Sequence, residues 1–174
     1  MVVAARPVEV EVVLFHLGEQ GLLHRVVRAP LPEGADPDDT ALLAAGAARP
    51  DVSHSTSWRT EGETLVLTYA VLPDPDPAAG GESLSSGIVT SGDPTRPSPV
   101  DVGVHHVAAH AARHLAYLRA TDPTVAKAAR LSAHPGLWSA IAATTDLPVA
   151  THDLLAHSGD AATPSGRTAA RTPD

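Results

Sequence analysis

The N-terminal part of the chain alternates between apolar and polar positions. Between residues 8 and 16, valines and a leucine occupy every second position with glutamates among the others, which predicts a half-buried strand. The glycines of LGEQG at 17–21 suit a tight turn, and residues 22–29 return as a second strand. Residues 52–59 and 64–72, joined by Glu61-Gly62-Glu63, predict a second hairpin.

An alanine- and leucine-rich segment between the two hairpins predicts a helix. Asp36 is placed to cap this helix, Pro37 suits its first turn and Pro50 ends it. The order strand, strand, helix, strand, strand favours an antiparallel sheet with a helix packed over it.

Helical spacing replaces this alternation near the C-terminus. Residues 101–119 carry an apolar stripe of helical period, made up of Val104, Val107, Ala108, Ala111, Leu115 and Leu118. Thr121-Asp122-Pro123 predicts the start of a second helix that ends near Leu131. A third helix is predicted over 135–144 and a last turn over 148–157. The whole pattern predicts an α+β fold, with an antiparallel sheet of about four strands and a C-terminal helical cluster packed on one face.

Two segments lack such periodicity. Residues 73–100 hold six prolines and four glycines, so we expect a long loop that is either a functional flap or a disordered excursion. Ile88-Val89 would allow a brief strand in it. Residues 158–174 have no apolar face and are expected to be a disordered tail. We therefore expect a single domain over 1–157.

Composition narrows the function classes. Aromatic residues make up only 3% of the chain, so the core must be built from Val, Leu and Ala. The absence of cysteine excludes disulfides, thiolate zinc sites and cysteine nucleophiles. The net charge of −8 would repel a phosphate backbone, so nucleic acid is not an expected partner. No apolar run is long enough to cross a bilayer, and Pro7, Glu9 and Glu11 argue against a signal peptide. We expect a soluble, cytoplasmic protein that does not bind membranes.

The segment 104–118, VHHVAAHAARHLAYL, offers the first candidate chemistry. His106, His110 and His114 recur every four residues and therefore climb one flank of the predicted helix. Adjacent pairs of these histidines could share a divalent metal such as Zn²⁺, for which His54, Asp51 or the long loop would supply a third ligand. The alternative is that the histidines are solvated residues flanking a helix that packs on the sheet.

The segment 51–59, DVSHSTSWR, offers the second candidate site. Strict alternation would place His54 and Trp58 on one face of a strand, and Ser55, Ser57 and Arg59 on the other. Such a polar face suits hydrogen bonding to a small polar or anionic ligand. The paired N–H donors of Arg59 would bind a carboxylate or phosphate. The alternative is a solvent-facing strand in which Arg59 balances the nearby glutamates.

These observations leave open whether the protein is an enzyme. We expect a non-catalytic module that binds a small ligand or a protein, with a homodimer as one expected form. The alternative is a metal-assisted hydrolase or isomerase that uses the histidines of the 104–118 helix. A third expectation is a pH-responsive contact made by the same helix.

Overall fold

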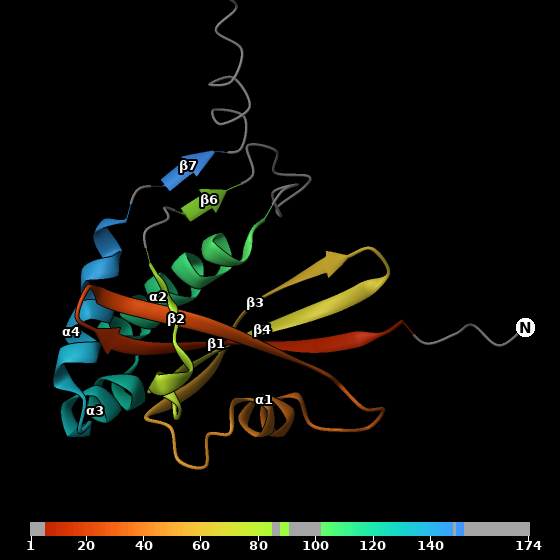
Figure 1. Ribbon diagram of the computed structural model, residues 1–174, viewed down its shortest axis with the longest axis horizontal. Coiled ribbons are helices and arrows are strands. Elements are labelled where there is room, and N and C mark those ends of the chain that lie inside the picture. The colour runs from red at the N-terminus through yellow and green to blue at the C-terminus, as the bar shows by residue number, and fades with distance from the viewer. Residues whose placement is uncertain (1–5, 85–87, 91–101, 148, 152–174) are drawn as a thin grey trace, which may run out of the picture.

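The computed structural model describes residues 6–84, 88–90, 102–147 and 149–151, and the description below is confined to them. In chain order the elements are β1 (Val8–Gly18), β2 (Gly21–Pro30), α1 (Pro37–Ala45), β3 (Val52–Glu61), β4 (Thr64–Leu72), a 3-10 turn (Pro77–Ala79), β5 (Glu82–Ser83), β6 (Ile88–Thr90), α2 (Val104–Thr121), α3 (Pro123–Leu131), α4 (Pro135–Ala143), a second 3-10 turn (Thr144–Asp146) and β7 (Val149–Thr151) (Figure 1).

The main sheet has five strands in the order β3-β4-β1-β2-β5. Strands β1 and β2 form one antiparallel hairpin and β3 and β4 form the other, as predicted. The prediction of an antiparallel, four-stranded sheet was only partly right, because β1 and β4 run parallel and β5 adds a short fifth strand. The two most apolar strands, β1 and β4, take the centre of the sheet, where both faces are covered.

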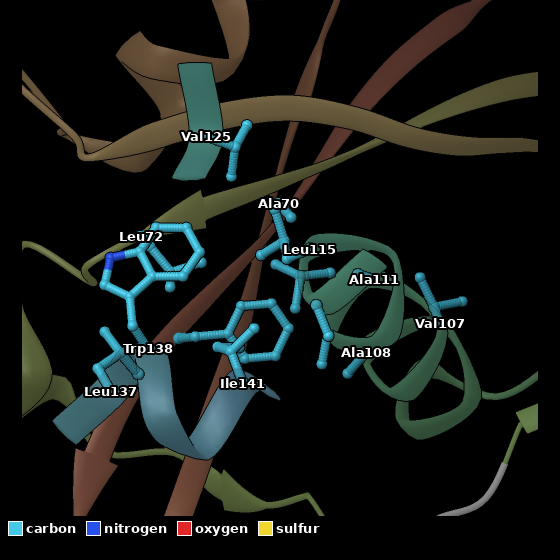
Figure 2. Close-up of a cluster of buried hydrophobic side chains, with 14 residues drawn as sticks. Ala70, Leu72, Val107, Ala108, Ala111, Leu115, Val125, Leu137, Trp138 and Ile141 are labelled. Atoms are coloured by element: carbon cyan, nitrogen blue, oxygen red, sulfur yellow. The ribbon is translucent and has the colours of Figure 1, made fainter. Parts of the chain in front are cut away.

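Helices cover both faces of this sheet (Figure 1). Helices α2, α3 and α4 pack on one face, which we call the α2 face, and α1 packs on the other, the α1 face. Figure 2 shows the larger core, on the α2 face, where Trp138 and Ile141 of α4 meet Leu115 of α2 above the sheet residues Ala70 and Leu72. The smaller core joins the alanines of α1 to Val10, Val12, Leu14, Tyr69 and Val71. The predicted helical cluster on one face is confirmed.

Local signals fix the helix ends. The Asp36 side chain accepts hydrogen bonds from the backbone N–H groups of Asp38 and Asp39, which caps α1. Gly46, at φ 67°, ends α1 in the left-handed conformation that favours glycine. Asp122 caps α3 in the same way as Asp36 caps α1.

Residues 73–84 of the proline-rich segment are described and include β5. The brief strand expected at Ile88-Val89 forms as β6 and pairs in parallel with β7. The helical turn predicted over 148–157 was wrong for 149–151, which are extended; 152–157 and the predicted tail lie outside the described residues. None of the described helices combines the length and apolarity needed to cross a bilayer.

Candidate functional site

Three histidines and a tyrosine gather where β3 meets α2. The ring of His54, on β3, stacks on that of His114, on α2, with centroids 5.2 Å apart and planes 17° apart. His110, one helical turn before His114, lies 6.3 Å from it, and the phenol ring of Tyr117 lies 6.5 Å from it on the other side. We call His54, His110, His114 and Tyr117 the imidazole patch.

A close helix–sheet contact brings these rings together. Helix α2 faces the sheet with small residues, Ala108, Ala111 and Ala112, and with Leu115, all of which are fully buried. Because their side chains are short, the helix axis approaches β4 closely, and the histidines on its flank reach the neighbouring edge strand β3. The patch is only partly covered: His110 is exposed, whereas His54 and His114 are half-buried.

Burial lowers the pKa of His114, and the nearby imidazoles of His54 and His110 lower it further. His114 is therefore a neutral imidazole near pH 7. A neutral imidazole offers one N–H donor and one lone pair, which serves as a hydrogen-bond acceptor or as a metal ligand.

His106 lies apart from this patch. Its Nδ1 accepts a hydrogen bond from the backbone N–H of Gly103 at 3.2 Å, so it caps its own helix, and its ring contacts that of His105. Burial and the neighbouring His105 lower the pKa of His106. His106 thus contacts His105 and the start of its helix, whereas His54 and His110 are the imidazoles near His114. Within the described part of the chain, no three His, Asp or Glu side chains are already arranged to hold a metal ion.

A β-bulge in β3 divides the second predicted site. Ser55 pairs with Tyr69 but Ser57 pairs with Thr68, so Thr56 is the extra residue and the alternation reverses there. Ser55 and Trp58 consequently face the α1 side. Ser57 and Arg59 face the α2 side with His54. The single polar face expected from strict alternation was therefore wrong, because the prediction assumed an unbroken strand.

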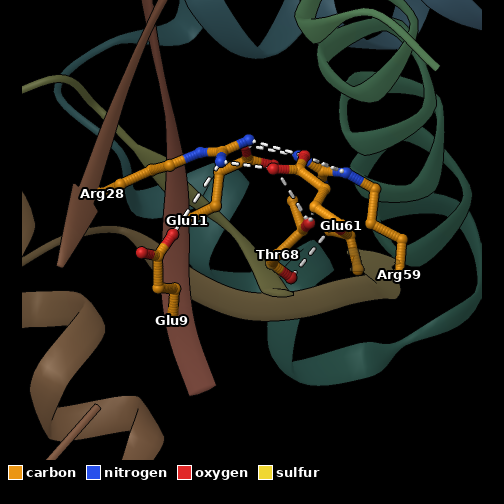
Figure 3. A network of polar contacts seen from close by, with 7 residues as sticks. Glu9, Glu11, Arg28, Arg59, Glu61 and Thr68 are labelled. Atoms are coloured by element: carbon orange, nitrogen blue, oxygen red, sulfur yellow. Dashed lines mark hydrogen bonds and ion pairs between the residues drawn. The ribbon is translucent and has the colours of Figure 1, made fainter. Parts of the chain in front are cut away.

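Arg59 belongs to a closed network of charges (Figure 3). It donates two hydrogen bonds to the buried carboxylate of Glu11, at 2.7 and 2.8 Å, and further ones to Glu61 and Thr68. Arg28 bonds the same two carboxylates from β2. Burial would raise the pKa of Glu11, but the two guanidiniums outweigh it and hold that pKa below its ordinary value. The sequence suggested that the Arg59 guanidinium could bind a carboxylate or phosphate ligand. In the structure its N–H groups are instead engaged by Glu11, Glu61 and Thr68.

A second buried carboxylate escaped the sequence prediction. Asp74 follows β4 and accepts a bidentate pair of hydrogen bonds from Arg25 at 2.7 and 2.6 Å. The imidazole Nδ1 of His16 lies 3.3 Å from the same carboxylate without hydrogen-bond geometry. Burial would raise the pKa of Asp74, but Arg25 holds it down. His16 and Asp74 line a pocket of about 320 Å³ together with His134. In the sequence, Asp74 was indistinguishable from the other acids of the proline-rich segment.

A larger groove of about 700 Å³ runs along β2 to the start of α2. His24 lines this groove and is only 2% exposed, and its Nδ1 has no partner among the described residues. Burial lowers its pKa, opposed by the nearby Glu82. The alternating pattern of β2 predicted a strand here but gave no sign that this histidine is buried.

Comparison with known proteins gives no relative from which a function could be transferred. No family model matches the chain, and neither the curated proteins nor the solved structures contain a match.

Proposed function

We propose that this domain is a non-catalytic ligand-binding module whose binding surface is the imidazole patch. The observation that carries the proposal is the approach of His54 to His114, since it joins imidazoles from two elements that are distant in the sequence. Single histidines on a helix flank are usually solvated residues. A cluster of partly exposed imidazole rings from two elements is a better candidate for recognition.

The contrast with the other polar groups supports this choice. Glu11, Arg28, Arg59 and Glu61 satisfy one another, and Arg25 satisfies Asp74. The contacts that join the members of the imidazole patch are ring contacts. Their nitrogen atoms can bind a ligand without breaking any of the ion pairs above. The core beneath α2 fixes the backbone that carries His110 and His114, and a preorganised surface loses less conformational freedom on binding.

A thermal-shift experiment on the untagged full chain tests this proposal. The probes are ZnCl₂, NiCl₂, sodium phosphate and sodium citrate, each added separately at pH 7.5. We expect at least one probe to raise Tm by several degrees, since ligands that bind only the folded state stabilise it. The shift should disappear in the double variant H54A/H110A and persist in H134A, which removes an exposed histidine outside the patch. A response that is absent, or equal in both variants, would refute the proposal.

The enzymatic alternative, a metal-assisted hydrolase or isomerase, stays a prediction. It needs an ion that keeps one position open for water or substrate, as three protein ligands allow. Its three ligands would now include His54 in place of His106. Hydrolysis of a simple aryl ester by the zinc-loaded chain, lost in H110A, would favour this alternative over a purely binding role. A homodimer, protein partners and a cytoplasmic location also remain proposals; light scattering after size exclusion tests the first.

A further inference from the structure

We propose that the outer edge of β2 binds an extended peptide from a partner protein, which adds a strand to the sheet beside Val26 and Arg28. This surface is separate from the imidazole patch and would give the domain a second kind of ligand. In the sheet order β5 is the neighbour of β2 on this side, but it pairs only with Leu23 and His24. The rest of β2, toward Pro30, has no neighbouring strand on its outer side among the described residues.

One hydrogen bond shows which backbone groups of β2 face outward. The N–H of Leu84 donates to the carbonyl oxygen of Leu22 at 3.0 Å, so Leu22 directs its backbone groups toward the β5 side. In an antiparallel ladder this direction alternates from residue to residue, and the register of β1 with β2 has no bulge. Val26 and Arg28 therefore also point their N–H and C=O groups outward. Within the described part of the chain nothing bonds to these groups, and such an edge is a template for another strand.

A groove of about 700 Å³ borders this open part of the edge. The residues that line it include Val26 and Arg28 of β2, Gly80, and Val104 at the start of α2. Residues 77–79 form a 3-10 turn and Gly80 has a φ of 85°, so the chain before β5 does not continue along β2. The groove therefore lies where the row begun by β5 would continue, and an added strand would extend that row.

A buried histidine in the same groove lacks a hydrogen-bond partner. His24 lines the groove, and its Nδ1 bonds to none of the described residues. An unsatisfied buried polar atom costs free energy. A polar side chain of the peptide that reached this nitrogen would remove that cost, so His24 is a second observation that favours a ligand here.

Charge favours a peptide over a second copy of this chain. Two copies of β2 could pair antiparallel through both Val26 and Arg28 only in registers that avoid β5. In each of those registers the Arg28 side chains of the two copies would lie directly opposite or diagonal to each other, where like charges repel. A peptide need not carry that charge.

The groove residues indicate an uncharged peptide rich in β-branched residues. Arg28 donates hydrogen bonds to Glu11 and Glu61, so it does not require an acidic partner. Val26 and Val104, the latter 42% exposed, offer apolar contacts to alternate side chains of an added strand. Valine and threonine suit this position because β-branched residues favour strands.

Isothermal titration of the full chain with the blocked peptide Ac-TVTVTV-NH₂ at pH 7.5 tests the proposal. We expect one site per chain, and no binding of the same peptide with every amide N-methylated, because that peptide cannot donate to a strand edge. Affinity should fall about tenfold or more in V26P. It should change little in L131A, which removes an exposed apolar side chain on α3. Proline at position 26 removes only an outward N–H, so the pairing with β1 is kept.

Amide hydrogen exchange followed by NMR gives an independent readout. Without peptide, the N–H groups of Val26 and Arg28 should exchange faster than that of Val27, which faces β1. The peptide should slow exchange at Val26 and Arg28. Circular dichroism and urea unfolding check that V26P folds; if it does not, V104E, which adds a charge to the groove without altering β2, takes its place with the same expected loss.

Three results would overturn the proposal: no binding of the peptide, equal binding of the methylated peptide, or unchanged affinity in the groove variant. Light scattering after size exclusion tests the rival occupant. A dimer of the unmodified chain that V26P or V104E abolishes would assign this edge to a second copy instead of a peptide. None of these results depends on the imidazole patch, so the proposed function stands or fails separately.

Discussion

The carboxylate of Glu11 and the imidazole of His54 lie in neighbouring cross-strand rows on the same face of the sheet. One row runs through Ser57, Thr68, Glu11 and Arg28 on four strands. The next row runs through His54, Ala70, Val13 and Val26. Glu11 is fully buried and its two oxygens accept hydrogen bonds from two arginines and a threonine. His54 instead meets another imidazole that carries the same kind of groups.

The difference between these rows shows how polar residues can be separated into structural and binding groups. Groups of opposite charge satisfy each other's hydrogen bonds. The charged groups around Glu11 are therefore paired, and their contacts hold four strands together. Identical imidazoles cannot neutralise one another, so the patch keeps nitrogens available for a ligand. Glu11 and His54 are both polar side chains that lie beside buried surface on the same face of the sheet. The complementarity of their neighbours distinguishes them.

The largest effect on stability that we expect comes from breaking the ion pairs around Glu11. Replacing Glu11 by Ala leaves the guanidinium of Arg59, only 11% exposed, without its main partner. Removing one member of a buried ion pair costs about 3–5 kcal/mol, because the remaining charge stays desolvated. Urea unfolding followed by circular dichroism should show this loss in E11A.

Two comparisons sharpen that measurement. Glu63 is exposed in the turn between β3 and β4, so E63A should change the stability by no more than about 0.5 kcal/mol. In an R59M background the E11A substitution should cost less, because one of the stranded charges is gone. A loss of unfolding free energy in E11A no larger than that in E63A would mean that the ion pairs around Glu11 contribute little to stability.

The sequence predicted those parts of the fold that depend on neighbours along the chain. The capping aspartates, Asp36 and Asp122, act within three residues, so the pattern alone located α1 and α3. Both hairpins were found for the same reason. The parallel pairing of β1 with β4 depends on how two hairpins assemble, and nothing in either hairpin encodes it.

The candidate site was less predictable because it is built from tertiary contacts. Glu11 was assigned to the polar side of a half-buried strand, since its arginine partners come from β2 and β3. The register of the first hairpin places Glu11 opposite Arg28, and this cross-strand pair was the one available signal. The bulge at Thr56 follows from pairing with β4, so alternation put Ser57 and Arg59 beside Ser55.

A smaller effect is expected from acidifying the imidazole patch. The pKa of His114 is lowered in the folded protein, first by burial and then by His54 and His110. An unfolded histidine has a pKa of about 6.5, so as the pH falls below that value the unfolded chain binds the proton more readily. Stability that is present above about pH 6.5 is therefore lost on acidification. The urea midpoint should be lower at pH 5.5 than at pH 7.5.

The share of this loss due to the patch is measured with H114Q, which should reduce the pH dependence; the rest is expected from His24 and His106, whose pKa values burial also lowers. Tyr117→Phe keeps all three imidazoles and should leave it unchanged. The carboxylates of Glu11 and Glu61 do not interfere, because their lowered pKa values, about 2 for Glu61, place their effect at more acidic pH. Equal pH dependence of stability in H114Q and the unmodified chain would show that the pKa of His114 is not lowered as expected.

The smallest effect is expected at Trp58, which tests whether the bulge separates the two sides of β3. Trp58 is 64% exposed and faces the α1 side, whereas His54 faces the α2 side. Trp58→Ser should therefore change the free energy of unfolding by no more than about 0.5 kcal/mol. Trp138, only 1% exposed, is the matched contrast, and Trp138→Ala should cost about 3–5 kcal/mol. A loss above about 2 kcal/mol in W58S would mean that this tryptophan is packed like a core residue. The bulge would then not divide β3 as described, and Trp58 would again be a candidate for the same surface as His54.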